Sequence, residues 1–93
     1  MSAVRIYTTS YCGFCYAAKR LLHGKGIAFE EIDVTGDTER RQWLEDATGQ
    51  HTVPQVFIGE EAVGGFTDIR DLDRRGKLDA LVRQALTATA PEA

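Results

Sequence analysis

The feature that most restricts the fold of this chain is a pair of cysteines, Cys12 and Cys15, placed between an apolar segment and a helical one. Residues 4–8 have the apolar pattern of a short strand, and from Phe14 onward apolar residues recur at helical spacing. A disulfide across so short a loop restricts the unfolded chain little, so a stabilising staple is a weak explanation. A strand, a CxxC loop and a helix in this order are typical of a reactive thiol instead, because free N–H groups at a helix N-terminus stabilise a thiolate.

The two thiols have different expected roles. Cys12 lies at the expected loop–helix junction, so we assign it as the nucleophile of thiol–disulfide exchange. Cys15 lies in the first helical turn, is expected to be less accessible, and is assigned as the thiol that resolves the mixed disulfide. Two alternatives carry less weight. One is that both cysteines are small core residues; the other is a structural zinc site, which needs four ligands, whereas His23 and His51 are remote in sequence.

Strand and helix patterns alternate along the rest of the chain. The expected elements are a strand at 4–8, a helix at 14–24, a strand at 27–34, a helix ending at Gly49, strands at 56–58 and 62–63, a short helix, and an amphipathic helix at 78–86. Asp37 and Thr67 are the expected N-caps, and Trp43 and Leu44 are expected in the core. The order βαβαββαα predicts an α/β fold with a four-stranded mixed sheet flanked by helices, in which the first two strands are parallel and the last two form a hairpin.

Composition narrows the function classes. The 93 residues are expected to form one domain over 1–87, followed by a flexible tail at 88–93. A net charge of −3 with scattered basic residues gives no reason to expect a nucleic-acid or membrane partner, and no apolar run approaches the roughly 20 residues of a membrane span. Without a long apolar stretch at the start, the chain is expected in the cytoplasm, where structural disulfides are rare.

Two further stretches are candidates for substrate binding. Thr52-Val53-Pro54 precedes a strand; a cis bond before the proline would turn the Val53 backbone toward a peptide-like substrate, although the residues alone favour an ordinary trans proline. Gly64-Gly65 directly precedes a helix whose N–H groups suit a carboxylate, while Asp68 suits an ammonium, as on an amino-acid head group. The alternative for this second stretch is a plain turn with an N-cap.

Together these stretches resemble the glutaredoxin family, in its short dithiol class. The matching segments cover nearly the whole chain, from about residue 3 to 86, and include Tyr11-Cys12-Gly13-Phe14-Cys15, Thr52-Val53-Pro54-Gln55-Val56-Phe57-Ile58-Gly59, and Gly64-Gly65 with Asp68. The resemblance implies a thioredoxin-like fold with a cis Pro54. It also implies glutathione as co-substrate with no tightly bound cofactor, and reduction of protein–glutathione mixed disulfides and protein disulfides as the activity.

The resemblance also implies particular glutathione contacts. Val53 would pair with the cysteinyl backbone, and Arg41 would lie near the glycyl carboxylate. The γ-glutamyl end would be held by Gly65, Phe66, Thr67 and Asp68. Further contacts are expected from Tyr11, Phe14, Thr52 and Pro54.

Two departures from the family pattern leave an alternative open. Thr9 stands where many members have lysine, and Gly13-Phe14 replaces the common Pro-Tyr. Some members without that proline bind a [2Fe-2S] cluster between two subunits through the first cysteine and glutathione, so a cluster-bridged homodimer using Cys12 is the alternative to a monomeric reductase. A third hypothesis is a glutathione-independent redoxin reduced by a flavoenzyme. The expected partners of the reductase are glutathione and disulfide-containing or glutathionylated proteins.

Overall fold

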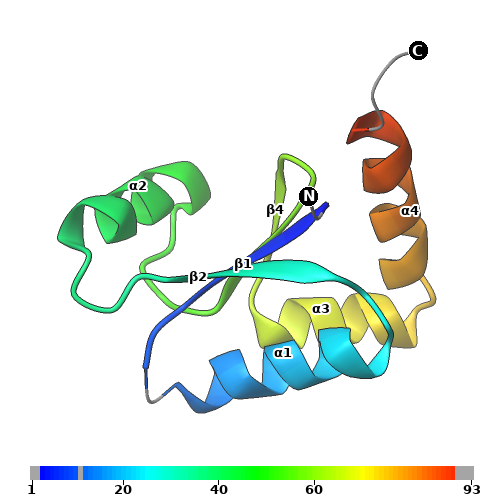
Figure 1. Ribbon diagram of the computed structural model, residues 1–93, viewed down its shortest axis with the longest axis horizontal. Helices are drawn as coiled ribbons and strands as arrows, with labels where there is room; N and C mark the ends of the chain where they lie inside the picture. The colour runs from blue at the N-terminus through cyan, green and yellow to red at the C-terminus, as the bar shows by residue number, and fades with distance from the viewer. Residues whose placement is uncertain (1–2, 11, 90–93) are drawn as a thin grey trace.

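A computed structural model describes residues 3–10 and 12–89. The elements in chain order are β1 (Val4–Thr8), α1 (Gly13–Gly24), β2 (Phe29–Asp33), α2 (Thr38–Thr48), β3 (Gln55–Ile58), β4 (Glu61–Gly64), α3 (Phe66–Arg74) and α4 (Leu78–Thr89). This is the βαβαββαα order predicted from the sequence (Figure 1). Within the described residues no helix is long and apolar enough to cross a membrane.

The sheet is mixed, with strand order β2-β1-β3-β4. β1 pairs parallel with β2, with Val4 opposite Phe29, and antiparallel with β3, with Tyr7 opposite Gln55. β3 and β4 form the expected antiparallel hairpin, with an irregularity between Val56 and Phe57. The fold class is therefore confirmed as a thioredoxin-like α/β arrangement.

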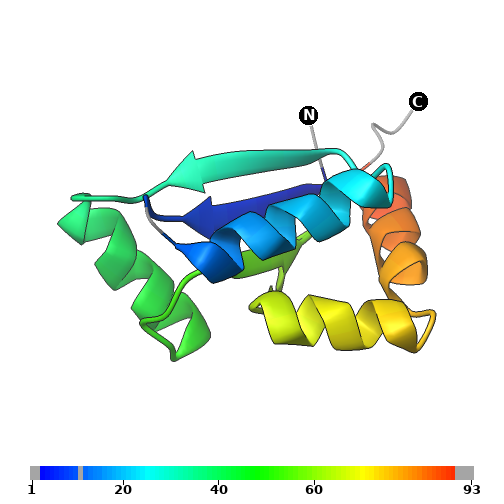
Figure 2. The same cartoon turned by 90° about the horizontal axis from the view of Figure 1, so that it is seen from below.

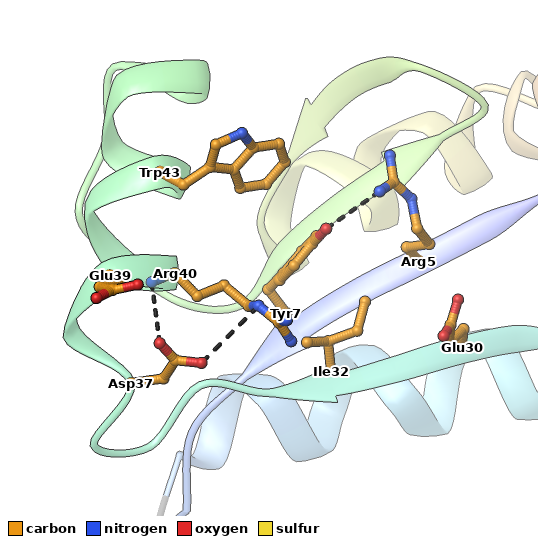
Figure 3. Close-up of a pocket in the computed structure, with 8 residues that line it drawn as sticks. All are labelled: Arg5, Tyr7, Glu30, Ile32, Asp37, Glu39, Arg40 and Trp43. Carbon is orange, nitrogen blue, oxygen red and sulfur yellow. Dashed lines mark hydrogen bonds and ion pairs between the residues drawn. The ribbon is translucent and has the colours of Figure 1, made fainter.

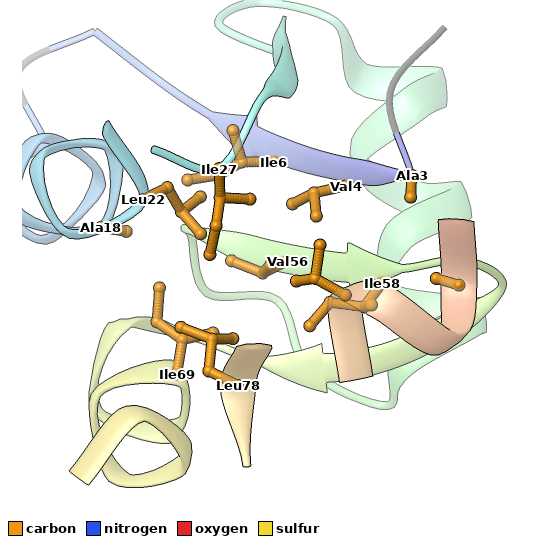
Figure 4. Packing of buried hydrophobic residues seen from close by; sticks show 12 residues of the cluster. Ala3, Val4, Ile6, Ala18, Leu22, Ile27, Val56, Ile58, Ile69 and Leu78 are labelled. Carbon is orange, nitrogen blue, oxygen red and sulfur yellow. The ribbon is translucent and has the colours of Figure 1, made fainter. Parts of the chain in front are cut away.

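Helices cover both faces of the sheet, and each face has its own core. α1 and α3 pack against each other along one face, while α2 lies over the other (Figure 2). In the larger core, side chains of α1, α3 and α4 pack against β1 and β3. Its members include Ile6, Leu22, Val56, Ile69 and Leu78 (Figure 4). The smaller core, beneath α2, consists of Tyr7, Val34, Leu44 and Phe57. Alternating residues of β1 thus supply both cores, as the period of two in a strand requires.

Several sequence-based boundaries need correction. β2 is shorter than the predicted 27–34, and α4 continues to Thr89, past the helix end predicted at residue 86. Residues 90–93 of the predicted tail lie outside the described part. Trp43, expected in the core, is 46% exposed, because α2 buries only Leu44 fully. Leu86, an apolar residue of the predicted amphipathic helix at 78–86, is half exposed.

Candidate functional site

Three segments that are distant in sequence meet at one edge of the sheet. β1 ends at this edge, β3 begins there and β4 ends there, because β3 runs antiparallel to both of its neighbours. Cys12 follows β1, Pro54 directly precedes β3, and Gly65 directly follows β4. The three stretches identified in the sequence are therefore brought together by the strand directions.

Cys12 is the N-cap residue of α1. Its backbone is extended, with φ −108° and ψ 106°, and its Sγ accepts a hydrogen bond from the Cys15 N–H at 3.1 Å. On the other side, the Cys12 thiol donates to the Val53 carbonyl at 3.7 Å, across 41 positions of sequence. Cys12 is half-buried, so its sulfur combines a helix N-terminal donor with access from outside.

Cys15 lies behind Cys12 and is 2% exposed. Burial raises the pKa of the Cys15 thiol to about 12, and its hydrogen bond with Cys12 adds to the increase. Both cysteines are free thiols in this structure. The predicted difference in accessibility between the two thiols is therefore present, with Cys15 the buried member.

The Val53–Pro54 peptide bond is cis. This agrees with the implication of the family resemblance and contradicts the trans bond that the residues alone favoured. Pro54 is buried and Val53 is half-buried. The buried amide of Gln55 holds this turn by donating from Nε2 to the Thr52 carbonyl at 2.9 Å. Gln55 had no predicted role, although it is a polar residue at the start of an otherwise apolar strand.

The turn between β4 and α3 places two glycines against neighbouring groups. Gly64 has φ +112°, and a Cβ there would overlap the Asp68 carboxylate. A Cβ on Gly65 would lie 3.2 Å from the Pro54 carbonyl oxygen, so this turn packs closely on the cis-proline segment. The Gly65 N–H donates to Asp68 Oδ2 at 2.9 Å. The N-cap of α3 is therefore Gly65, and the sequence-based assignment of Thr67 as the cap is wrong.

Other expected site residues lie at the margins of this edge. The rings of Phe14 and Phe66 stack with centroids 6.3 Å apart, which joins the first turns of α1 and α3. Arg41 donates from Nη2 to the His51 carbonyl at 2.9 Å and so ties α2 to the segment before Pro54. Thr67 is exposed on the first turn of α3. Tyr11 lies outside the described residues.

A polar cluster beside Cys15 was not singled out from the sequence. Glu31 Oε2 accepts hydrogen bonds from Thr8 Oγ1 at 2.8 Å and from Lys19 Nζ at 3.0 Å, and these two donors, Lys19 above all, hold the pKa of Glu31 below its ordinary value. Because the cluster joins α1, β1 and β2, no local spacing identifies it.

A cavity between α2 and the sheet lies away from the cysteines. It has a volume of about 570 Å³ and is lined by Arg5, Tyr7, Glu30, Ile32, Asp37, Glu39, Arg40 and Trp43 (Figure 3). The Arg5 guanidinium donates to the Tyr7 hydroxyl at 3.1 Å and lies 5.1 Å from the Phe57 ring centroid. Both signs of charge line this cavity, and neither thiol does, so the chemistry of the cysteines belongs to the sheet edge.

Comparison with known proteins agrees with this geometry. The glutaredoxin family model matches residues 4–63, well over half of the chain. A glutaredoxin of Pseudomonas aeruginosa is 50% identical over 82 residues, which is 88% of this chain and 98% of the relative.

Two solved plant structures superpose closely. The holo form of glutaredoxin C1 from Populus tremula x tremuloides has a TM-score of 0.87 at 29% identity, and the superposition covers 99% of this chain and 85% of the poplar chain. A buckwheat glutaredoxin–glutathione complex has a TM-score of 0.84 at 30% identity, with coverage of 90% and 79%. Family model, curated relative and solved structures agree on one assignment: this chain belongs to the glutaredoxin family.

Proposed function

We propose that the chain is a glutathione-dependent thiol–disulfide oxidoreductase with Cys12 as nucleophile and Cys15 as resolving thiol. Disulfide reduction with glutathione is the general activity of its family. The observation that carries the assignment of roles is the position of Cys12 Sγ, which accepts the Cys15 N–H at the start of α1 while Cys15 itself is buried. A thiolate at a helix N-terminus is stabilised there and remains nucleophilic.

The first reaction removes glutathione from a modified protein. The Cys12 thiolate attacks the glutathione sulfur, the new disulfide forms as the old one breaks, and the protein thiolate leaves and takes up a proton. A second glutathione thiolate then attacks the sulfur of the bound glutathione. This step yields oxidised glutathione and regenerates the Cys12 thiolate, so each cycle consumes one free glutathione thiol and transfers the disulfide of the substrate to oxidised glutathione.

Glutathione is proposed to bind between the cis-proline turn and the start of α3. The Val53 backbone would pair with its cysteinyl unit, and Gly65 with Asp68 would hold the γ-glutamyl carboxylate and ammonium. Support comes from the 3.7 Å contact of Cys12 with Val53 and from the bound glutathione of the buckwheat relative. Further contacts are proposed from Tyr11, Phe14, Arg41, Thr52, Pro54, Phe66 and Thr67.

Protein disulfides require the second thiol. Cys12 would attack one sulfur of the target disulfide and release the other as a thiolate, which leaves the attacked sulfur bonded to Cys12. Cys15 would then attack Cys12 Sγ and release that sulfur as the second thiolate. The products are a reduced target and a Cys12–Cys15 disulfide, which glutathione reduces in turn. One helical turn separates the two cysteines, so this closure needs no long movement of the chain.

Two single substitutions test the assignment. Cys12→Ser is expected to abolish the release of glutathione from a glutathionylated protein, whereas Cys15→Ser is expected to retain it and to lose only the reduction of protein disulfides. Circular dichroism of both variants confirms that each is folded. Full activity of the Cys12→Ser protein in the glutathione-coupled assay would refute the roles, and undiminished turnover without glutathione would favour a redoxin reduced by a flavoenzyme.

The alternative function is a [2Fe-2S] cluster held between two subunits by Cys12 and glutathione, and Gly13-Phe14 between the cysteines is the sequence feature that favours it. Such a site takes one cysteine from each subunit, so it needs no group of three or more ligating side chains within one chain, and none is found among residues 3–10 and 12–89. Anaerobic incubation with iron, sulfide and glutathione, followed by absorption and native mass measurements, distinguishes the two functions. A colourless monomer agrees with the reductase, and a coloured dimer would favour the cluster.

A further inference from the structure

One cavity is lined by both cysteines and, among the described residues, by none of those proposed to bind glutathione. Its volume is about 470 Å³, and its lining residues are Thr9, Ser10, Cys12, Gly13, Cys15, Tyr16, Lys19, Glu31 and Asp33. Lys19 follows Cys15 by four positions on α1, so the two side chains lie on the same face of the helix. This cavity is therefore a place where a charge can act on the resolving thiol.

The ammonium of Lys19 is held in place from the sheet. It donates to Glu31 Oε2 at 3.0 Å, and the same oxygen accepts from the hydroxyl of Thr8 at 2.8 Å. Thr8 is 1% exposed, so its hydroxyl is a fixed donor within β1. The flexible lysine is thus restrained beside Cys15 by two strands.

The surroundings of Cys15 act in opposite directions on its proton. Burial and the neighbouring Cys12 raise the pKa of Cys15, whereas a backbone hydrogen bond with Thr9 and the charge of Lys19 lower it. Once Cys12 is part of a mixed disulfide, it no longer carries a thiolate, and burial remains as the main obstacle to ionisation. Among the described residues that line the cavity with Cys15, Lys19 is the only cation, and the other titratable side chains are those of Cys12, Tyr16, Glu31 and Asp33.

We propose that Lys19 is a positioning residue for the resolving step, in which its ammonium stabilises the negative charge that develops on Cys15 Sγ. This inference rests on the proposed function, in its protein-disulfide reaction. Cys15 loses its proton to water and its thiolate attacks Cys12 Sγ. The bond from Cys12 to the target sulfur breaks, and the target thiolate leaves with the electron pair and takes a proton from water.

The aromatic disulfide 5,5′-dithiobis(2-nitrobenzoate) separates this step from the first one. Cys12 releases one coloured thiolate on attack, at a rate that increases with protein concentration. Cys15 releases the second thiolate in a step that does not depend on concentration. Rapid mixing of the reduced, full-length protein in excess over the reagent gives both rate constants, and Cys15→Ser should abolish only the second release.

Lys19→Met removes the ammonium and is expected to reduce the fraction of Cys15 that is ionised. For each tenfold loss of Cys15 thiolate, the rate constant of the second release, divided by that of the first, should fall by about threefold. The factor is smaller than ten because a more basic thiolate is intrinsically more nucleophilic, with a Brønsted coefficient of about 0.4–0.5. Lys19→Arg keeps the charge and should keep the ratio. The matched control, Lys77→Met, removes an exposed lysine from the turn before α4 and should leave the ratio unchanged.

Glu31→Gln separates charge from structure. It weakens the restraint on Lys19 but removes the opposing negative charge, so the second release should be at least as fast as in the wild-type protein. An unchanged ratio in Lys19→Met, or an equal slowing in Glu31→Gln, would overturn the proposal. A separate assay of glutathione release from a glutathionylated protein reports on the proposed function, so a failure there is distinguishable from a failure of the Lys19 inference.

Discussion

Asp68 is proposed to serve both the fold and the substrate, and two substitutions separate these contributions. Its carboxylate accepts the Gly65 N–H at 2.9 Å at the start of α3, and in the proposed function it also accepts from the ammonium of glutathione. Asp68→Asn keeps an oxygen acceptor for the N–H and removes the charge. Asp68→Ala removes both, so comparison of Asp68→Asn with the wild-type protein isolates the effect of the charge, and comparison of the two variants isolates the effect of the acceptor.

The expected magnitudes follow from the exposure of this residue. Loss of a capping side chain costs about 1 kcal/mol of unfolding free energy, so Asp68→Ala should be destabilised by about that amount. Asp68→Asn should lose about 0.5 kcal/mol or less, because only the favourable charge at the helix N-terminus is removed. For the exposed contact with the ammonium we expect about 1 kcal/mol, which corresponds to an approximately fivefold rise in the KM for glutathione.

Steady-state reduction of a glutathionylated protein at varied glutathione concentrations measures the KM, and urea unfolding measures stability. Asp71→Asn is the matched control, since Asp71 is an exposed carboxylate of the same helix that pairs with Arg75 at 3.1 Å. It should leave the KM for glutathione unchanged. If Asp68→Asn also has the wild-type KM, the carboxylate does not contact the ammonium and that part of the proposed site is wrong.

Three further predictions concern the fold. Gly64→Ala should lower the free energy of unfolding by about 1–3 kcal/mol in a urea titration, because φ is +112° and the new Cβ would overlap a carboxylate; a wild-type midpoint would contradict this. Leu22→Ala opens a cavity in the core beneath α1 and should cost about 2–5 kcal/mol in the same assay, whereas a loss below 1 kcal/mol would show that the site collapses around the gap. Hydrogen bonds to Asp73 and Asp79 raise the pKa of Lys25 in the folded protein. The stabilisation of the folded state by Lys25 is therefore complete below the ordinary lysine pKa of about 10.4, and it is lost as pH rises through the higher pKa of the folded protein. Unfolding free energy should therefore fall less steeply above that pH in Lys25→Met than in the wild-type protein, and parallel profiles would refute the assignment.

Local sequence patterns predicted the helices well where a short-range signal exists. Asp37 was expected to cap α2, and its carboxylate indeed accepts the Arg40 N–H at 3.0 Å. The same kind of signal failed at α3. There Thr67 has the favoured residue type, but the Gly65 N–H pairs with the Asp68 carboxylate, and the helix therefore begins one residue after Gly65. Residue preference for a cap is thus overridden when a nearby acidic side chain reaches an earlier N–H.

Contacts between residues that are distant in sequence could not be predicted from local patterns, because they depend on how the helices pack on the sheet. Trp43 has the large apolar side chain that is typical of a core residue, yet its burial depends on how much of the sheet α2 covers. The centroid of the Trp43 ring lies 5.7 Å from that of Tyr7 and 5.9 Å from that of Phe57, while Trp43 remains 46% exposed. The pairing of Lys19 with Glu31 likewise joins a helix to a strand, and nothing in their spacing along the chain indicates it.

The meeting of Cys12 with Val53 depends on strand register as well as on strand direction. The order of elements predicts that β1 ends where β3 begins, but the contact itself requires Tyr7 to lie opposite Gln55. A slip of one residue would move Val53 by about 3.3 Å along the strand and would turn every β3 side chain to the opposite face. Val56 would then leave the core beneath α1 and Phe57 would enter it. Because each face of β3 is buried in a different core, such a slip would cost packing on both faces, and the register that fills the two cores is the one that brings the Val53 carbonyl to Cys12.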